Sequence, residues 1–429
     1  MKVLQLTGYF LPEKAASIYL VENRLEAFAK EGFDMVIHAS RPTRGLSDEE
    51  YSEYKNKKEE MMYNGKLRIH RFAMYREGKN PLLRAMRYSF NWIIQLWYGL
   101  TEKNVDCVYL ESTPPIQGML GSFIKKIRGI PFVYCLQDIF PDSLYNNGLA
   151  NKSGLLWKIG RVIENFTYKH ADKIIVISED FKKNIMAKGV PEEKIVVVYN
   201  WVDQNAVVDI PREKNKLFDA YGLDRTKFYL TYNGNIGLSQ NMDMLLTVAE
   251  EFQSSKVQEF QGKEVDYTDI HFVLVGNGAY LDEVKRMVAE KKLENVHLLP
   301  FQPYEDISHV FSLGDVSLVI SKPGTGAASV PSKTWSIMSA SRPVLANFDE
   351  NELQDIIAEN VCGIFTKAGD KVAFTDAIIK LYGDRDLCKK YGENGRKFVM
   401  ANLTREVGAQ KYVDVIKSVV AEAEAKKHG

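Results

Sequence analysis

Residues 228–237 read Phe-Tyr-Leu-Thr-Tyr-Asn-Gly-Asn-Ile-Gly, a short apolar run that passes directly into a glycine-rich turn. Continuous rather than alternating hydrophobicity over Phe228–Tyr232 is typical of a strand covered on both faces, as in a parallel sheet. The glycines that follow, and a helix expected from about Ser239, complete a strand–turn–helix unit. This stretch therefore predicts an α/β fold built on a buried parallel sheet.

The same alternation of short apolar runs and longer helical segments extends in both directions. After the quoted stretch, strands are expected at Ile270–Val275, Val296–Leu299, Val316–Ile320, Pro343–Ala346 and Cys362–Phe365. Before it, strands are expected at Val3–Leu6, Met35–Ala39, Leu67–Phe72, Val105–Leu110, Pro131–Leu136, Lys173–Ile177 and Ile195–Tyr199, with helices such as Ser17–Lys30 and Gly154–His170 between them. Two such series in 429 residues predict two doubly wound, Rossmann-like domains that face each other across a ligand cleft.

The domain boundaries follow from a break in this pattern. Asp203–Asn215 is polar and irregular, which favours an interdomain connection. We therefore expect an N-terminal domain over residues 1–205 and a C-terminal domain over residues 206–405. Residues 406–429 have no strand character and predict a C-terminal amphipathic helix that packs back toward the N-terminal domain.

Charge and cysteine content limit the class of protein. The 56 basic and 56 acidic residues cancel, so nothing global indicates nucleic acid. Residues 1–200 hold 29 Lys and Arg against 23 Asp and Glu, a surplus that suits an anionic membrane surface or ordinary scatter equally well. Four cysteines without a C-x-x-C pair, and a first apolar run cut short at Pro12, predict a cytoplasmic protein without a signal peptide.

A peripheral membrane contact is also an open alternative. The most apolar later stretch, Phe90–Leu100, has about half the length that crosses a bilayer. Aromatic and basic residues near it can form a membrane-facing patch or be ordinary core and surface residues; they are Trp92, Trp97, Tyr98, Arg84, Arg87, Lys125, Lys126 and Arg128.

Three glycine-rich loops follow strands of the second domain. Gly234-Asn235-Ile236-Gly237 follows the first strand, and Gly276-Asn277-Gly278 follows the second. Backbone amides in such loops, next to a helix start, form an anion site suited to a diphosphate, although a tight turn alone explains them too. The second loop lacks the third glycine of a dinucleotide fingerprint, because residue 281 is Leu, and is weak evidence for NAD.

The third loop carries small residues and leads to a lysine. Thr325 and Gly326 lie in this loop, and Pro331-Ser332-Lys333 opens a helix. A lysine in the first turn of a helix is electrostatically unfavourable unless an anion lies nearby. Ser332 is alternatively an N-cap, and both roles are compatible.

The first domain offers candidates at the ends of two strands. Glu13, Lys14 and Ser17 lie in a loop after the first strand. Asp138 follows the fifth strand, where a carboxylate can bind a hydroxyl or accept its proton, or else cap a helix. No metal site is expected, because the seven histidines have no ligand spacing and Asp384-Arg385-Asp386 lies between helices.

Seven motifs in this order resemble the GT4 glycosyltransferases, particularly a bacterial capsule and O-antigen subgroup similar to the fucosaminyltransferases. Nearly the whole chain is covered. The motifs are Phe10-Leu11-Pro12-Glu13, residues 137–143 (QDIFPDS), residues 171–178 (ADKIIVIS), Asn200-Trp201-Val202-Asp203, Gly234-Asn235-Ile236-Gly237, Val275-Gly276-Asn277-Gly278 and Pro331-Ser332-Lys333.

The resemblance implies a GT-B fold and transfer of a hexose or N-acetylated amino sugar from a UDP-sugar, without a metal and with retention of anomeric configuration. The acceptor would be a glycan, such as one linked to undecaprenyl diphosphate, bound by the first domain through Glu13, Lys14, Ser17 and Asp138. The second domain would hold the donor, with Phe301 and Gln302 near the base and with Lys333 and the Gly234–Gly237 loop at the diphosphate. The Gly324–Ala328 loop, which contains Thr325 and Gly326, would face the donor sugar. Gly276 and Gly278, where a sugar or nucleotide edge can pass close to the backbone, and Ser332 complete the donor-binding residues. Asp138 and Lys333 are the catalytic candidates.

The chain also departs from the family pattern. Many members have Arg and Lys where this chain has Asn235 and Gln240, and the family's Glu-x7-Glu falls on about Ala328 and Ser336. Two alternatives stay open on this account. One is a UDP-sugar epimerase of similar fold, and the other is a glycan- or nucleotide-binding protein that has lost catalysis.

Overall fold

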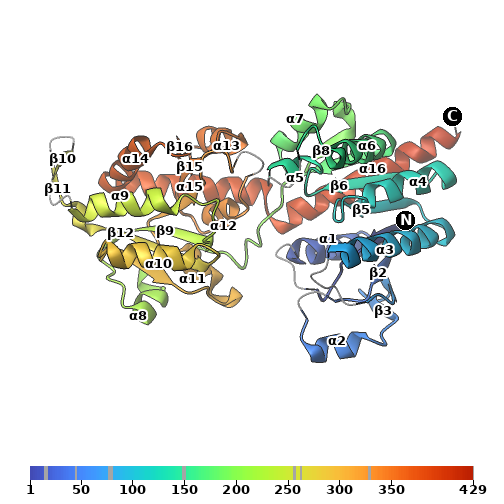
Figure 1. Cartoon of the computed structure of the whole chain (residues 1–429), viewed down its shortest axis with the longest axis horizontal. Helices are drawn as coiled ribbons and strands as arrows, with labels where there is room; N and C mark the ends of the chain where they lie inside the picture. Colours follow the sequence, from blue (N-terminus) through green and yellow to red (C-terminus); the bar gives the residue numbers. More distant parts are fainter. Residues whose placement is uncertain are drawn as a thin grey trace. The chain divides into compact units, whose positions relative to one another are not determined.

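The computed structural model describes residues 1–13, 18–43, 46–75, 81–146, 151–254, 258–260, 263–326 and 330–428. The chain forms two compact units, of which unit 1 comprises Met1–Asn200 with Glu406–Gly429 and unit 2 comprises Trp201–Arg405 (Figure 1). Each unit contains one largely parallel sheet between helices, as the apolar runs predict. The first division falls after Asn200, whereas the sequence placed it after residue 205.

Unit 1 is built on an eight-stranded sheet in the order β3-β4-β2-β1-β5-β6-β7-β8. Its strands are β1 (Lys2–Thr7), β2 (Asp34–Ser40), β3 (Glu59–Met62), β4 (Leu67–Phe72), β5 (Cys107–Glu111), β6 (Phe132–Leu136), β7 (Lys173–Val176) and β8 (Ile195–Val197). Its helices are α1 (Ile18–Lys30), α2 (Asp48–Tyr54), α3 (Pro81–Thr101), α4 (Gln117–Arg128), α5 (Asp142–Asn146), α6 (Leu155–His170), α7 (Glu179–Ala187) and most of α16 (Arg405–His428). The antiparallel edge strand β3 is absent from the sequence prediction, because Glu59–Met62 is half charged and exposed on alternate residues.

Helices cover both faces of this sheet. On one face, Leu110 and Tyr134 pack with residues of α4 and α6 in a single apolar cluster. On the other face, the Tyr412 hydroxyl of α16 lies 3.2 Å from Cys135 Sγ, and its ring lies 6.2 Å from the ring of Tyr109. The C-terminal helix is therefore part of the core of unit 1.

Unit 2 is built on a six-stranded parallel sheet in the order β13-β12-β9-β14-β15-β16. The sheet strands are β9 (Phe228–Asn235), β12 (Ile270–Asn277), β13 (Val296–Leu299), β14 (Val316–Ile320), β15 (Val344–Phe348) and β16 (Gly363–Lys367), and a separate hairpin pairs β10 (Gln258–Phe260) with β11 (Lys263–Val265). The helices are α8 (Leu217–Tyr221), α9 (Met242–Ser254), α10 (Leu281–Glu290), α11 (Ile307–Phe311), α12 (Lys333–Ser339), α13 (Glu352–Asn360), α14 (Lys371–Gly383) and α15 (Arg385–Asn402).

The strand order of unit 2 places its loops. From β9 the chain first winds outward through β12 and β13, and then returns to the other side of β9 for β14, β15 and β16. The order thus reverses between β9 and β14, and ligands of open parallel sheets bind beyond the carboxyl ends of the strands at such a point. The glycine-rich loops predicted from the sequence follow β9, β12 and β14, which are the three strands at this reversal.

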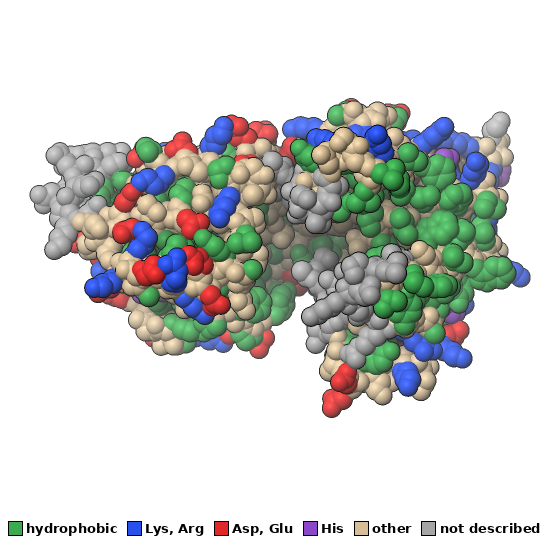
Figure 2. Space-filling model, viewed as in Figure 1, with side chains coloured by type: hydrophobic (Ala, Val, Ile, Leu, Met, Phe, Trp, Pro, Cys, Tyr) green, Lys and Arg blue, Asp and Glu red, His purple; other side chains and the backbone are tan. Residues whose placement is uncertain are grey.

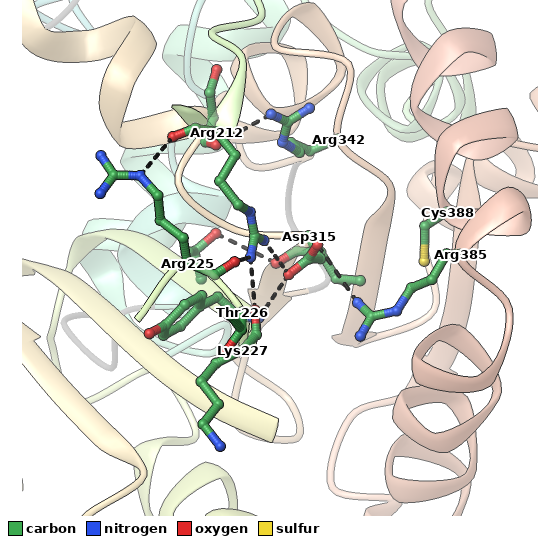
Figure 3. A network of polar contacts seen from close by, with 12 residues as sticks. Arg212, Arg225, Thr226, Lys227, Asp315, Arg342, Arg385 and Cys388 are labelled. Atoms are coloured by element: carbon green, nitrogen blue, oxygen red, sulfur yellow. Dashed lines mark hydrogen bonds and ion pairs between the residues drawn. The ribbon is translucent and has the colours of Figure 1, made fainter. Parts of the chain in front are cut away.

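The opposite, amino-terminal edge of this sheet is held by a network around Asp315 (Figure 3). The Asp315 carboxylate accepts hydrogen bonds from Arg212 at 2.6 Å and from the Tyr229 backbone N–H at 2.8 Å. Arg385 lies within ion-pair distance of the same carboxylate, and its neighbour Asp384 caps α15. The D-x-D sequence therefore has a structural role at the edge away from the glycine-rich loops.

The segment Asp203–Asn215 is not a free connection. The Val208 and Ile210 backbone N–H groups donate to the hydroxyls of Ser308 and Ser312 at 3.0 and 2.9 Å. Val207 is buried. Serine side chains of α11 and the adjoining turn thus hold the backbone of this segment against the rest of unit 2.

Candidate active site

The glycine loops after β9 and β12 pack against each other backbone to backbone. The Ile236 N–H donates to the Asn277 carbonyl at 2.9 Å, and the Ile236 carbonyl accepts from the Tyr280 N–H at 3.0 Å. A Cβ added at Gly276 would overlap the carbonyl oxygen of Gly234, and one added at Gly278 would overlap that of Ile236. These two glycines are thus required by the contact between the loops, whatever else the loops bind.

Gly234 and Gly237 have different surroundings. Gly234 has a φ of 128°, in the region that favours glycine, and an added Cβ there would meet no atom within 4 Å. At Gly237 a Cβ would lie 2.6 Å from the Asn235 side chain and 2.9 Å from that of Gln240. The Gly237 N–H donates to the Gln240 side chain at 2.9 Å. Gln240, where many family members carry a cation, therefore braces this loop.

Lys333, the first residue of α12, is the predicted cation of this site. Its Nζ atom lies 3.6 Å from the centre of the Tyr232 ring, and the Tyr232 hydroxyl donates to the Asn235 carbonyl at 2.7 Å. No hydrogen bond or ion pair of its ammonium occurs within the described ranges. Burial lowers the pKa of Lys333 from 10.5 to about 7. The site therefore holds a poorly solvated cation beside the Gly234–Gly237 loop, an arrangement that favours binding of an anion.

Ser332 occupies the N-cap position of α12, but its backbone is helical and its side chain makes no capping hydrogen bond. The alternative that Ser332 caps the helix is therefore wrong. The exposed hydroxyl is free of that role.

The loop after β14 is fixed by one carboxylate. Asp349 accepts from the backbone N–H groups of Gly324 and Gly326 at 2.9 and 2.6 Å. The Thr325 hydroxyl donates to the Ser239 carbonyl at 3.0 Å, which ties this loop to the one after β9. Ala328, the position of the first family carboxylate, lies outside the described residues.

Two buried polar side chains at this edge have no hydrogen-bond partner among the described residues. Asn233, the residue just before Gly234, is 5% exposed, and neither its side-chain oxygen nor its nitrogen is bonded. The hydroxyl of Ser321, the residue directly after β14, is also buried and also has no hydrogen-bond partner among the described residues. Leaving such groups unpaired is costly, so both are candidates to bind a ligand. Sequence analysis missed them, although an amide at the end of an apolar strand is itself a signal.

The residues predicted near the base follow β13. Phe301 is 75% exposed, and the Gln302 side chain donates to the Tyr221 hydroxyl at 2.8 Å. An exposed aromatic ring beside strand ends can stack on a planar base. Gln302 is already engaged within the protein.

In unit 1 the loop after β6 presents Asp138. The backbone N–H groups of Gln137 and Asp138 donate to the Ser112 hydroxyl at 3.0 and 3.2 Å. The Asp138 side chain is exposed and accepts no hydrogen bond from the described residues, so it caps no helix. Its carboxylate is thus available to a hydroxyl group of a ligand.

Glu13 requires a correction. It is 4% exposed, and its carboxylate accepts from the backbone N–H groups of Phe10 at 3.1 Å and Thr43 at 2.7 Å. The structure thus assigns Glu13 to holding the loop after β1, rather than to direct contact with an acceptor. Lys14 and Ser17 lie outside the described residues.

No group of three or more His, Cys, Asp or Glu side chains with metal-binding geometry occurs in the described part of the chain. Two lysines lie in or beside the glycine-rich loops of unit 2: Lys333, and Lys322, whose Nζ atom lies 3.5 Å from the Asp243 carboxylate.

Two family models match the chain. The model described as glycosyl transferases group 1 matches residues 213–398, within unit 2, and that described as glycosyl transferase 4-like domain matches residues 20–201, within unit 1 but for its last residue. Together they cover most of the sequence. The chain therefore belongs to the group 1 glycosyltransferases, enzymes with the GT-B fold.

Relatives agree with this assignment. WbjE of Pseudomonas aeruginosa, provisionally named a glycosyltransferase, is 23% identical over 82% of this chain and 85% of its own length. WcaI of Escherichia coli strain K12, provisionally named a colanic acid biosynthesis glycosyl transferase, is 22% identical over 79% of this chain and 81% of its own. The crystal structure of Anabaena HepE in complex with UDP has a TM-score of 0.70 at 16% identity, covering 97% of this chain and all of that one, which shows a shared fold.

Proposed function

We propose that this chain transfers a hexose or N-acetylated amino sugar from a UDP-sugar to a glycan acceptor in the synthesis of a bacterial surface polysaccharide. The single observation that carries the donor half of the proposal is the ammonium of Lys333, which lies over the Tyr232 ring beside the Gly234–Gly237 loop and has no anionic partner among the described residues. A nucleotide diphosphate placed there would supply the missing anion and accept hydrogen bonds from backbone N–H groups.

The choice of UDP and of the pathway is supported by the relatives. HepE was crystallised with UDP and with UDP-glucose, and WcaI is named for colanic acid biosynthesis. The N-acetylated amino sugar is included because the seven motifs, taken together, resemble the subgroup similar to the fucosaminyltransferases. A lipid-linked acceptor, such as a glycan on undecaprenyl diphosphate, belongs to the same proposal.

The proposed roles divide the chemistry between the two units. Lys333 stabilises the negative charge that develops on the departing UDP, which lowers the barrier because this charge is larger in the transition state than in the bound donor. Asp138 orients the acceptor hydroxyl or accepts its proton. Because Lys333 supplies positive charge beside the Gly234–Gly237 loop, we infer that no divalent metal is needed. Retention of configuration at the anomeric carbon belongs to the proposal through the resemblance to the GT4 glycosyltransferases alone.

Nucleotide binding is the first test. Thermal unfolding of the full chain would be followed with UDP, GDP, ADP, CMP and NAD, since a ligand at about a hundredfold its Kd stabilises the folded state by about 2.7 kcal/mol. We expect stabilisation by UDP. Stabilisation by GDP or ADP alone would refute the donor, and no stabilisation by any nucleotide would favour a protein that has lost catalysis.

Turnover distinguishes the enzymatic alternatives. With a UDP-sugar panel, UDP release that requires acceptor indicates transfer, whereas conversion to another UDP-sugar without acceptor indicates an epimerase. Proton NMR of the product gives the anomeric configuration, and an unchanged rate in EDTA is expected. An inverted product or a rate abolished by EDTA would overturn those two parts of the proposal.

A further inference from the structure

Helix α3 in unit 1 has its polar residues inside. Arg87, Asn91 and Gln95 lie four residues apart and are each at least 97% buried. The Gln95 side chain donates to the Thr7 carbonyl of β1 at 2.6 Å, and Arg87 lies 3.4 Å from the Ser40 hydroxyl. The helix is therefore attached to the sheet through hydrogen bonds, whereas an ordinary surface helix buries an apolar face.

The outward side of α3 is apolar. Leu83, Met86, Phe90, Ile93 and Trp97 follow a spacing of three and four residues, which places them on one side of the helix, and they are 44–67% exposed. At 1.5 Å per residue this stripe is about 21 Å long. A soluble surface helix normally carries polar residues here, so the pattern of α3 is reversed.

Of the aromatic residues that the sequence assigned to a membrane-facing patch, only Trp97 points outward. The Trp92 indole donates to the Ile116 carbonyl at 3.3 Å, and the Tyr98 ring stacks on His38 at 4.0 Å. These two rings help to fix α3 to the unit.

The apolar surface continues over the neighbouring helices. On α6, Leu155, Leu156, Ile159 and Val162 are 48–74% exposed, and on α4 Ile127 is 63% exposed. Figure 2 shows hydrophobic side chains gathered over the part of unit 1 where Figure 1 labels α3 and α4.

Aromatic contacts join the three helices into one layer. The Phe123 ring of α4 lies 5.8 Å from Trp92 of α3 and 5.4 Å from Phe166 of α6. We use the term "apolar face" for the exposed apolar residues of α3, α4 and α6 named in the preceding paragraphs. Exposed patches of this extent mark interaction sites in soluble proteins.

The charge of these helices indicates what covers the face. The sequences of α3, α4 and α6 contain eight Lys and Arg residues and one acidic residue, Glu164. Glu164 is buried and bonded to Arg161 and Lys188, so it presents no negative charge. Lys126, Lys158 and Lys169 are exposed. An apolar surface on helices that expose lysines, and no acidic side chain among their described residues, complements a bilayer with anionic headgroups.

We propose that the apolar face docks unit 1 on the surface of an anionic lipid bilayer, with α3 lying in the plane of the membrane interface. The described helices include none that is long and apolar enough to cross a membrane. The apolar side chains enter the boundary between headgroups and acyl chains, while the lysines contact lipid phosphates. This inference stands on the surface of unit 1 and does not depend on the donor proposed above.

Flotation with vesicles tests the proposal. Wild-type protein is expected to float with vesicles of phosphatidylcholine containing about one third phosphatidylglycerol, more weakly with phosphatidylcholine alone, and less as salt is raised. Replacement of both Ile93 and Trp97 by serine should lower the vesicle-bound to free ratio at least about tenfold, because each side chain loses the burial of a large apolar group. Lys126→Glu with Lys158→Glu should abolish the preference for anionic vesicles.

Matched controls are available on other surfaces. Met61 of β3 and Val372 of α14 are 64% and 68% exposed, and Met61→Ser and Val372→Ser should float as the wild type does. Unchanged thermal unfolding of each variant verifies its fold. Nucleotide binding should also be unchanged, so failure of this proposal is distinguishable from failure of the donor proposal.

Three results would overturn the inference. The first would be that the wild-type protein fails to float with anionic vesicles. The second would be that the variant with both Ile93→Ser and Trp97→Ser floats as well as the wild type. In the third, sedimentation shows a wild-type dimer that this variant converts to monomers without any vesicle binding, which would assign the face to a second copy of the chain.

Discussion

Replacing Lys333 by methionine removes the ammonium but keeps an unbranched side chain of similar length over the Tyr232 ring. In the proposed complex the ammonium makes a hydrogen bond between charged groups to the donor diphosphate. Such a bond contributes about 1.5–3 kcal/mol, so we expect the Kd for UDP-glucose to rise about 10- to 150-fold. Turnover should fall further, by roughly 10²–10³, because the charge on the departing UDP increases in the transition state.

The same substitution should increase the stability of the ligand-free protein. Its folded state holds a poorly solvated cation without an acidic partner among the described residues, and burial lowers the pKa of Lys333 from 10.5 to about 7. We therefore expect Lys333→Met to stabilise the ligand-free protein by about 1–3 kcal/mol below pH 7. Loss of affinity together with gain of stability is the result that a purely structural lysine would not give.

The pH dependence has a definite sign. Between about pH 7 and 10.5 the unfolded chain keeps the Lys333 proton, whereas the folded protein has lost it. Because the unfolded state binds more protons, this residue makes the wild type more stable as pH rises, and the advantage of Lys333→Met should shrink across that window. Affinity for UDP-glucose should fall as pH rises above about 7, since its phosphate diesters do not titrate there.

Calorimetric titration with UDP-glucose at several pH values, and thermal unfolding of both proteins without ligand, measure these effects. Lys333→Arg keeps the charge and serves as the control, so it should retain more affinity than Lys333→Met. If Lys333→Met binds UDP-glucose as tightly as the wild type at pH 6–7, Lys333 is not part of the donor site.

Gly276→Ala is expected to lower the free energy of unfolding by at least about 2 kcal/mol and to weaken UDP binding, because its Cβ would overlap the Gly234 carbonyl; wild-type melting would refute the backbone contact between the two loops. Asp315→Ala should destabilise the protein by about 2–4 kcal/mol, since it leaves the Arg212 guanidinium without its carboxylate, and UDP affinity per folded protein should stay constant in titration. Asp138→Asn should lower acceptor-dependent turnover by about 10²–10⁴ with the Kd for UDP-glucose unchanged; wild-type turnover would remove Asp138 from the chemistry.

The buried strands were the part of the fold most accessible from sequence. Strands covered on both faces are continuous apolar runs, and those of β9 and β12 begin at the predicted residues. The edge strand β3 lacks such a run, because an exposed strand needs no apolar sequence. The hairpin β10–β11 was not predicted either, because each of its strands is three residues long and mixes charged or polar residues with a single apolar one. The glycines and Lys333 followed from chemistry that is local in sequence.

Other features of the candidate site depend on tertiary contacts. Glu13 looked like a loop residue open to ligand, but Thr43, thirty positions away, supplies a buried partner. Ser332 stands at a helix start, yet its backbone conformation prevents capping. That the buried Asn233 side chain has no hydrogen-bond partner among the described residues depends on its three-dimensional neighbours, which the sequence does not give. The reversed pattern of α3 was also hidden, because periodicity shows two faces and does not say which one is inside.

The packing of α16 in unit 1 affects how the chain folds while the ribosome is synthesising it. Tyr412, Val413 and Ile416 are buried in a unit whose other residues end at Asn200, so the ribosome must make all of unit 2 before unit 1 can complete its core. During that interval the side of the sheet around Tyr109 lacks its cover. The earlier-made half of the polypeptide is thus the later one to mature, and nascent chains released before residue 405 would expose a surface that invites aggregation and proteolysis.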